Sequence, residues 1–154
     1  MSVFSNQFNI TMAKTTKKTL KKKTTSKKSV SKNAAKYVDG FLLPLKTTML
    51  SEYKKVSNKA RKVWLEHGAL NYIESIGDDM NIEGMTGFGD YIKPAKDESI
   101  VFAFITYKSK ADRNRVNKKV MADPRLTEDC FNPDKMPFDL KKMAYGGFKV
   151  IVGE

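Results

Sequence analysis

The stretch VWLEHGALNY, residues 63–72, decides how this chain folds. It holds the only Trp and the only His of the 154 residues, Trp64 and His67. The apolar residues before Gly68 follow helical spacing, and a glycine directly after a helix favours the left-handed conformation that ends it. The residues from Ala69 to Ile76 then have the pattern of a strand. The stretch therefore predicts a core-packed helix, a glycine stop and an immediate turn into a sheet.

Upstream of this junction the sequence predicts a strand and the body of the helix. The apolar run at residues 37–44 ends in a proline and suits a strand. Thr47 or Thr48 is expected to cap the helix, with Glu52 in its first turn. One helical face collects the apolar residues, which are Met49, Tyr53, Val56, Ala60, Val63 and Trp64. The basic residues between them are expected to face solvent.

Downstream, residues 80–98 are rich in glycine and predict a loop. The run from Ile100 to Tyr107 places apolar residues on both faces of a strand, which predicts a central strand covered on both sides. Ser109 with Asp112 gives a capping signal for a second helix that stops before Pro124.

The last predicted strand, residues 143–152, contains the pair Gly146-Gly147. Two glycines inside a strand indicate a bulge or the close approach of another group. The element order is then β-α-β-β-α-β, the split β-α-β of an α+β, ferredoxin-like protomer. Two helices cover only one face of a four-stranded sheet, yet the central strand is apolar on both. A second copy is the simplest cover, so the sequence predicts a homodimer with its sheets face to face, a dimeric α/β barrel.

The net charge of +12 belongs to the N-terminal tail. Residues 1–36 hold ten lysines and no acid, which leaves 19 basic against 17 acidic residues in the domain at 37–154. A tail of Lys, Thr and Ser buries too little surface to order itself and is predicted to be disordered. Met12 offers an alternative start to Met1. Residues 14–36 are expected to attract nucleic acid non-specifically through counterion release, a solubilising or a targeting tail being the alternatives. The lysines in question are Lys17, Lys18, Lys21, Lys22, Lys23, Lys27 and Lys28.

Several classes of function are disfavoured by composition. No apolar run reaches the roughly 18 residues of a membrane span. Cys130 is the only cysteine, which fits a reducing, cytoplasmic setting. One His and one Cys give no zinc-like ligand set, so no metal and no cofactor are predicted. The glycine-rich run at residues 84–89 lacks the Lys-Ser/Thr of a phosphate loop and is expected to lie over a cavity mouth.

His67 is the best catalytic candidate, because the end of a helix shifts a histidine's titration toward neutral pH. Asp78 or Asp79 would be its partner. The alternative, which is the commoner case, is a capping histidine that bonds the last helical carbonyls. Aromatic residues on the predicted strands belong to the core or to an apolar pocket between the sheets. The pocket candidates are Trp64, Tyr72, Asp78, Phe104, Tyr107, Tyr145 and Phe148.

A set of short motifs, in this order and spacing, resembles the YbaA-like bacterial family of unknown function. They are YVDGF at 37–41, VW at 63–64 with HGAL at 67–70, YKS at 107–109, Arg113 with RVN at 115–117, VM at 120–121 with DPR at 123–125, MPF at 136–138 and YGGF at 145–148. The resemblance covers about residues 37–153 and leaves the lysine-rich tail without a counterpart. It implies a ferredoxin-like protomer in a dimeric α/β barrel, and it implies no settled activity.

The sequence thus predicts a cytoplasmic dimeric protein that binds a small organic molecule between its sheets. Two other classes stay open. One is a small-substrate enzyme, such as a cofactor-independent monooxygenase, which rests on the analogy of fold alone. The other is nucleic-acid association through the basic tail.

Overall fold

The computed structural model describes residues 34–127 and 136–153. Its sheet has four strands in the order β2-β3-β1-β4, and all neighbours run antiparallel. The strands are β1 (Tyr37–Lys46), β2 (Asn71–Ile76), β3 (Glu98–Tyr107) and β4 (Ala144–Lys149). The long helices are α1 (Leu50–Glu66) and α3 (Lys110–Met121), and the short ones are η1 (Thr47–Met49), α2 (Phe88–Ile92), α4 (Pro124–Thr127) and η3 (Leu140–Lys142). The predicted α+β class is confirmed.

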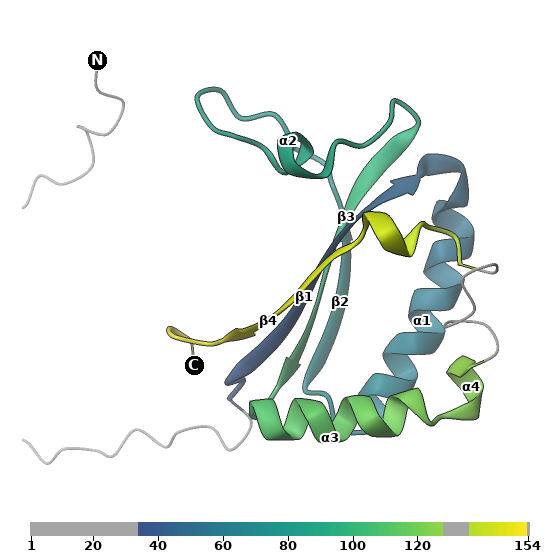
Figure 1. Cartoon of the computed structure of the whole chain (residues 1–154), viewed down its shortest axis with the longest axis vertical. Coiled ribbons are helices and arrows are strands. Elements are labelled where there is room, and N and C mark those ends of the chain that lie inside the picture. Colours follow the sequence, from purple (N-terminus) through teal and green to yellow (C-terminus); the bar gives the residue numbers. More distant parts are fainter. Residues whose placement is uncertain (1–33, 128–135, 154) are drawn as a thin grey trace, which may run out of the picture.

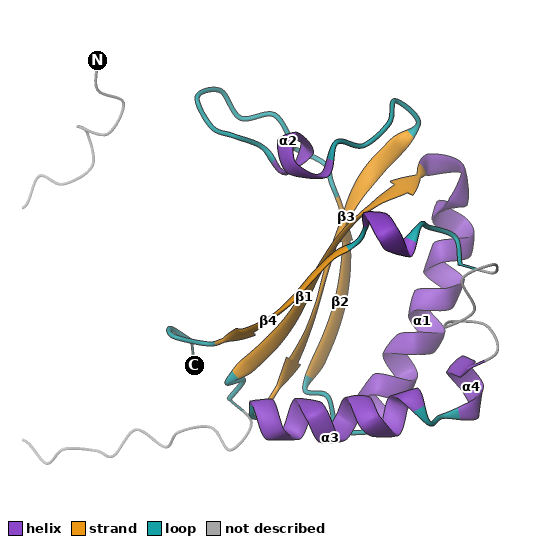
Figure 2. Cartoon of the chain, viewed as in Figure 1, coloured by secondary structure: helices purple, strands orange, loops and turns teal. Residues whose placement is uncertain are grey.

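The two long helices lie on the same face of the sheet (Figure 1). On the other face, α2 is the one helix of the described residues that approaches, near one end of β1 and β3 (Figure 2). The long elements follow the predicted order, with two strands and a loop between α1 and α3. A membrane-spanning helix is absent from the described ranges.

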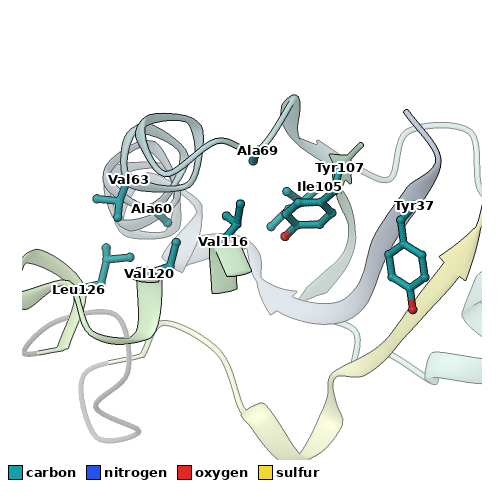
Figure 3. Packing of buried hydrophobic residues seen from close by; sticks show 9 residues of the cluster. All are labelled: Tyr37, Ala60, Val63, Ala69, Ile105, Tyr107, Val116, Val120 and Leu126. Atoms are coloured by element: carbon teal, nitrogen blue, oxygen red, sulfur yellow. The ribbon is translucent and has the colours of Figure 1, made fainter. Parts of the chain in front are cut away.

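The main core lies where α1, α3 and α4 meet the sheet (Figure 3). Val63 of α1 packs with Val116 and Val120 of α3 and with Leu126 of α4, and all four are fully buried. Burying a side chain of this size contributes roughly 1.5–3 kcal/mol each. The helical spacing of the apolar residues is what brings them to one face, as the sequence predicted.

The junction after α1 has the geometry that its sequence indicates. The His67 and Ala69 amides donate to the carbonyls of Val63 and Trp64, each at 3.0 Å. Gly68 between them has φ of +109°, in the region that favours glycine. Leu70 N then donates to Thr106 O at 2.8 Å, which brings the chain into the sheet beside β3.

The ends of several elements differ from the prediction. Neither threonine caps α1; the Thr47 hydroxyl instead donates to the carbonyl of Asp97 at 3.2 Å. β1 continues through Pro44 to Lys46, since β4 pairs with β1 only as far as Leu42 and leaves that edge open. The predicted loop at 80–98 contains the helix α2. The cap of α3 is as predicted, because Ser109 Oγ accepts from Asp112 N at 3.0 Å.

The sheet face away from the helices is apolar and partly exposed. β3 is central, as predicted, and its alternate residues Phe102 and Phe104 face this side together with Leu42 of β1. Phe102 is 44% exposed and Phe148 of β4 is 61% exposed. Within the described part of the chain, this face has no cover equal to the one that the helices give the other.

The glycines of β4 allow neighbouring side chains to approach the strand closely, which is one of the two predicted alternatives. Gly40 and Gly146 are paired without a bulge, and a Cβ on either would lie 3.2–3.3 Å from the ring of Phe148. On the opposite face, a Cβ on Gly147 would meet Arg113 at 2.8 Å and would also meet the Tyr37 hydroxyl. The missing side chains therefore leave room for an aromatic ring on one face and for a guanidinium on the other.

Gly68→Ala tests the junction. The positive φ strains any L side chain, and the new Cβ would lie 3.0 Å from an Arg115 nitrogen. We expect a loss of about 1–3 kcal/mol in the free energy of unfolding, measured with urea. Gly89→Ala is the control, because its φ is ordinary and a Cβ there meets nothing within 4 Å. Equal effects of the two substitutions would contradict this account.

Candidate functional site

A pocket of about 390 Å³ lies between the helix-covered face of the sheet and α1. Residues 136–145 line its remaining side. Most of its lining is apolar and comes from the sheet, α1, the end of α3 and this segment: Phe41, Leu43, Val56, Ala60, Ala103, Ile105, Met121, Met136, Phe138, Leu140 and Met143. The polar or amphipathic members are Tyr53, Ser57, Trp64, Tyr72, Glu74, Asn117 and Tyr145.

One wall of the pocket carries a carboxylate held by two tyrosines. The Tyr53 hydroxyl of α1 donates to Glu74 Oε2 at 2.7 Å. The Tyr72 hydroxyl, two residues earlier on β2 and on the same face, donates to Glu74 Oε1 at 2.8 Å. Each carboxylate oxygen thus has one tyrosine donor, and its remaining lone pairs are not used by these bonds.

The protonation of this cluster follows from its burial. Burial raises the pKa of Glu74 above its ordinary value, and the hydrogen bonds from Tyr53, Tyr72 and Ser57 oppose this only in part. Burial and the charge of Glu74 both raise the pKa of Tyr53 far above its ordinary value. The Tyr53 hydroxyl is therefore protonated at neutral pH and acts as a donor.

A second polar network supports the opposite wall. The indole of Trp64 and the hydroxyl of Tyr107 both donate to Asn117 Oδ1, at 3.2 and 3.0 Å. The Asn117 amide donates in turn to Asp39 at 3.3 Å. Asp39 is only 1% exposed, and Arg113 Nε donates to it at 2.9 Å. The network joins both helices to the two central strands.

The arginine of this network, Arg113, is held in place by neighbours on β1 and β4. Its guanidinium carbon lies 5.4 Å from the ring centre of Tyr37, which is a cation–π distance. Gly147 of β4 gives Tyr37 and Arg113 the space that they occupy. Burial, followed by the charge of Asp39, raises the pKa of Tyr145 beside the network.

His67 lies outside the pocket and has a different partner from the predicted ones. Its Nε2 lies 2.8 Å from Asp123 Oδ2, so the pairing with Asp78 or Asp79 is wrong. The predicted alternative was that the imidazole bonds the last helical carbonyls of α1, whereas its Nε2 contacts Asp123. Asp123 is bound by Arg125 at 2.8 Å as well, and Arg125 then His67 lower the pKa of its carboxyl. The cluster joins the end of α1 to the start of α4.

The predicted pocket residues separate into three groups. Trp64, Tyr72 and Tyr145 line the pocket, and Tyr107 is fully buried behind it. Phe104 and Phe148 belong to the opposite sheet face, as the strand register shows. Asp78 is exposed after the end of β2. These last three are therefore not part of the same site.

The polar groups of the pocket that sequence reasoning missed are those of Tyr53, Ser57, Glu74 and Asn117. A signal for one of them was present, since Glu74 lies between Tyr72 and Ile76 on an otherwise aromatic and apolar face of β2. Across the described ranges no group of three His, Cys, Asp or Glu side chains is arranged to hold a metal ion. The tail lysines lie outside the described residues.

Comparison with known proteins shows the family of this chain. The family described as "Protein of unknown function (DUF1428)" matches residues 36–140. The chain belongs to this family. Relatives include the "Uncharacterized protein YbaA" of Escherichia coli K12 and that of Shigella flexneri, each 39% identical over 119 residues, 77% of this chain and 99% of the relative. The DUF1428 match thus includes β1, both long helices, β2 and β3, but not β4.

Solved structures also match this chain. One is titled "The Crystal Structure of Bacillus cereus protein related to NIF3", with 11% identity and a TM-score of 0.32. The alignment covers 77% of this chain and 26% of that structure, so this chain spans about a quarter of its length. Similarity at this level carries no argument about fold or function.

The raised pKa of Glu74 predicts a pH dependence of stability. The pKa of Glu74 in the folded state lies above the ordinary value of 4.5. The stability that this shift contributes is therefore complete below pH 4.5 and is lost as pH rises through the folded-state pKa. Urea unfolding between about pH 4 and about pH 7 should therefore show wild type losing stability relative to Glu74→Gln. Glu52→Gln, an exposed acid on α1, is the control. Identical pH profiles for Glu74→Gln and wild type would contradict the assignment.

Proposed function

We propose that this protein binds a small organic molecule in the pocket between its sheet and α1. The observation that supports this is the combination of an apolar cavity of about 390 Å³ with one polar cluster, Tyr53–Glu74–Tyr72, in its wall. Small-molecule sites in proteins have this size and this division of roles, where apolar walls give affinity and a few polar groups give orientation.

The polar cluster is suited to recognition because its geometry is already set. Glu74 is held from α1 by Tyr53 and from its own strand by Tyr72. A ligand that reaches this wall meets a carboxylate that does not need to reorganise, which lowers the entropic cost of binding. The pocket lies on the helix side, so the proposed ligand does not occupy the space between two sheets that the sequence pointed to.

Binding is a better-supported role than catalysis. The residues that line the pocket, as far as the chain is described, include no Cys, His or Lys. Glu74 and the tyrosine hydroxyls are the groups with acid–base chemistry, and each is bound to another. The enzyme alternative and the tail's affinity for nucleic acid stay predictions.

Ala60→Met tests the pocket. Ala60 lines it from α1, so a longer side chain fills part of the space. Phenethyl alcohol is a neutral aromatic probe, and Trp64 fluorescence reports its binding because Trp64 is the only Trp and lines the pocket. We expect Ala60→Met to weaken binding by about tenfold or more, a loss of about 1.4 kcal/mol.

Ala111→Met is the matched control for this experiment, since Ala111 lies on the exposed side of α3. It should bind the probe as wild type does. Overpacking lowers stability by about 1–3 kcal/mol, so both variants are first checked for cooperative thermal unfolding. Equal probe binding by wild type and Ala60→Met, both folded, would refute the pocket.

We also propose that the open sheet face pairs with the same face of a second copy. Its apolar members are Val38, Leu42, Ile73, Ile100, Phe102, Phe104 and Phe148. At roughly 4.8 Å between strands and 3.3 Å per residue, four strands of these lengths present on the order of 500 Å². A stable interface buries roughly 800 Å² per partner, so α2 and the C-terminal residues would have to contribute.

Those two segments are placed to do so. Figure 1 shows α2 and the residues after β4 on the side away from α1 and α3. Phe88 of α2 stacks on Phe102 with ring centres 6.3 Å apart, and Ile151 and Val152 are almost fully exposed. The face is therefore continuous with further apolar surface at two of its edges.

Phe102→Glu tests the dimer. A charge at the centre of an apolar interface has no partner there, so the dimer should dissociate. Size-exclusion chromatography with light scattering at micromolar concentration should give twice the 17.4 kDa chain mass for wild type and the single mass for the variant. Ala111→Glu on exposed α3 should stay dimeric. A monomeric wild type would overturn this proposal and leave the pocket proposal standing.

A further inference from the structure

We infer that the ligand of the pocket is a small aromatic amine, bound as its ammonium ion with the nitrogen at Glu74. This inference rests on the proposed function, because it names the chemical class that the same pocket would take. It depends on three features of the pocket: the sign of its charge, the free acceptor capacity of Glu74 and the aromatic lining around it.

The pocket has one formal charge, and it is negative. Among its described lining residues, Glu74 is the acid and no Lys, Arg or His is present. Asp39 lies behind Asn117 but is paired with Arg113. An anionic ligand would be repelled in this low-dielectric space, whereas a cation would be attracted.

Glu74 has donors but no cation. Within the described part of the chain it forms no ion pair with Lys, Arg or His, and the hydroxyls of Tyr53 and Tyr72 are neutral. A carboxylate offers about four acceptor positions, and the hydroxyls of Tyr53, Tyr72 and Ser57 take up to three, so at least one remains for a ligand. An ammonium donates up to three hydrogen bonds and supplies the missing charge, which makes its bonds to Glu74 roughly twice as strong as those of a neutral donor.

Aromatic rings surround this position. Trp64 and Tyr72 have ring centres 5.8 Å apart, as do Tyr53 and Phe138 on the side of α1. Ring faces attract cations and pack well on an aromatic ligand body. The lining therefore fits both parts of an aromatic amine, its ring and its charged end.

Two basic side chains share a second hollow with Glu74, on the solvent side. Glu74, Tyr53 and Tyr72 also line a surface hollow at the β2 edge, together with Lys54 and Arg61. These two basic residues are exposed and do not line the pocket itself. They balance the charge outside the cluster while the inner side of Glu74 stays free for a ligand.

Three probes that share a phenyl ring and differ in charge test the inference on the full chain. They are phenethylamine, phenethyl alcohol and phenylacetate, each titrated against Trp64 fluorescence. We expect the amine to bind at least about tenfold more tightly than the alcohol, and the acid to bind most weakly. Glu74→Gln should reduce the amine to the affinity of the alcohol and leave the alcohol within about twofold. Glu52→Gln, which removes an exposed acid of α1, should change none of the three.

A second variant keeps the test decisive if Glu74→Gln fails to fold. Glu74→Asp keeps the charge but withdraws it by one methylene, so it should weaken the amine while preserving its preference over the alcohol. Equal binding of amine and alcohol by wild type would overturn the amine inference and leave the pocket's function intact. Failure of all three probes to bind wild type would overturn both.

Discussion

The buried ion pair between Asp39 and Arg113 is the interaction on which the rest of the domain depends. It connects the middle strand β1 to α3 across the core, with an Nε–Oδ1 distance of 2.9 Å at a carboxylate that is 1% exposed. Removing one partner of such a pair leaves an unpaired buried charge, which costs about 3–5 kcal/mol. Asn117 extends the contact to Trp64 and Tyr107, so one network sets the positions of α1, α3, β1 and β3 together.

The pocket is a consequence of this arrangement. Where the network holds the sheet and helices together, side chains such as Val63 and Val116 pack without space between them. Near the N-terminus of α1 the helix is joined to β2 through the hydrogen bond between Tyr53 and Glu74. The cavity lies between this contact and the Asn117 network. The polar groups on both sides of the cavity are hydrogen-bonded. The apolar cavity between them therefore leaves no buried donor or acceptor of these groups without a partner.

The two faces of the sheet have different roles in the proposed function. The helix-covered face contains the pocket, and the open face carries Phe102 and Phe148 for a second copy. Both rest on the alternation of side chains along β3, where Ala103 and Ile105 face the helices and Phe102 and Phe104 face away. A strand that is apolar on both sides is what both proposals, the ligand site and the interface, depend on. The cluster of His67 and Asp123 belongs to neither and joins the ends of two helices.

Local physics in the sequence was sufficient for the long helices, the strands and the fold class, but not for α2 or the start of α1. Helical spacing identified α1 and α3, the glycine at position 68 indicated a positive φ after α1, and Ser109 indicated the cap of α3. Each of these features depends on residues a few positions apart. The site was different. Glu74 meets Tyr53 across 21 residues, His67 meets Asp123 across 56 and Arg113 meets Asp39 across 74. No spacing rule specifies such contacts, since they follow from how the helices pack on the sheet. Tertiary packing alone decided that the pocket lies beneath α1 and that the rare histidine lies outside it.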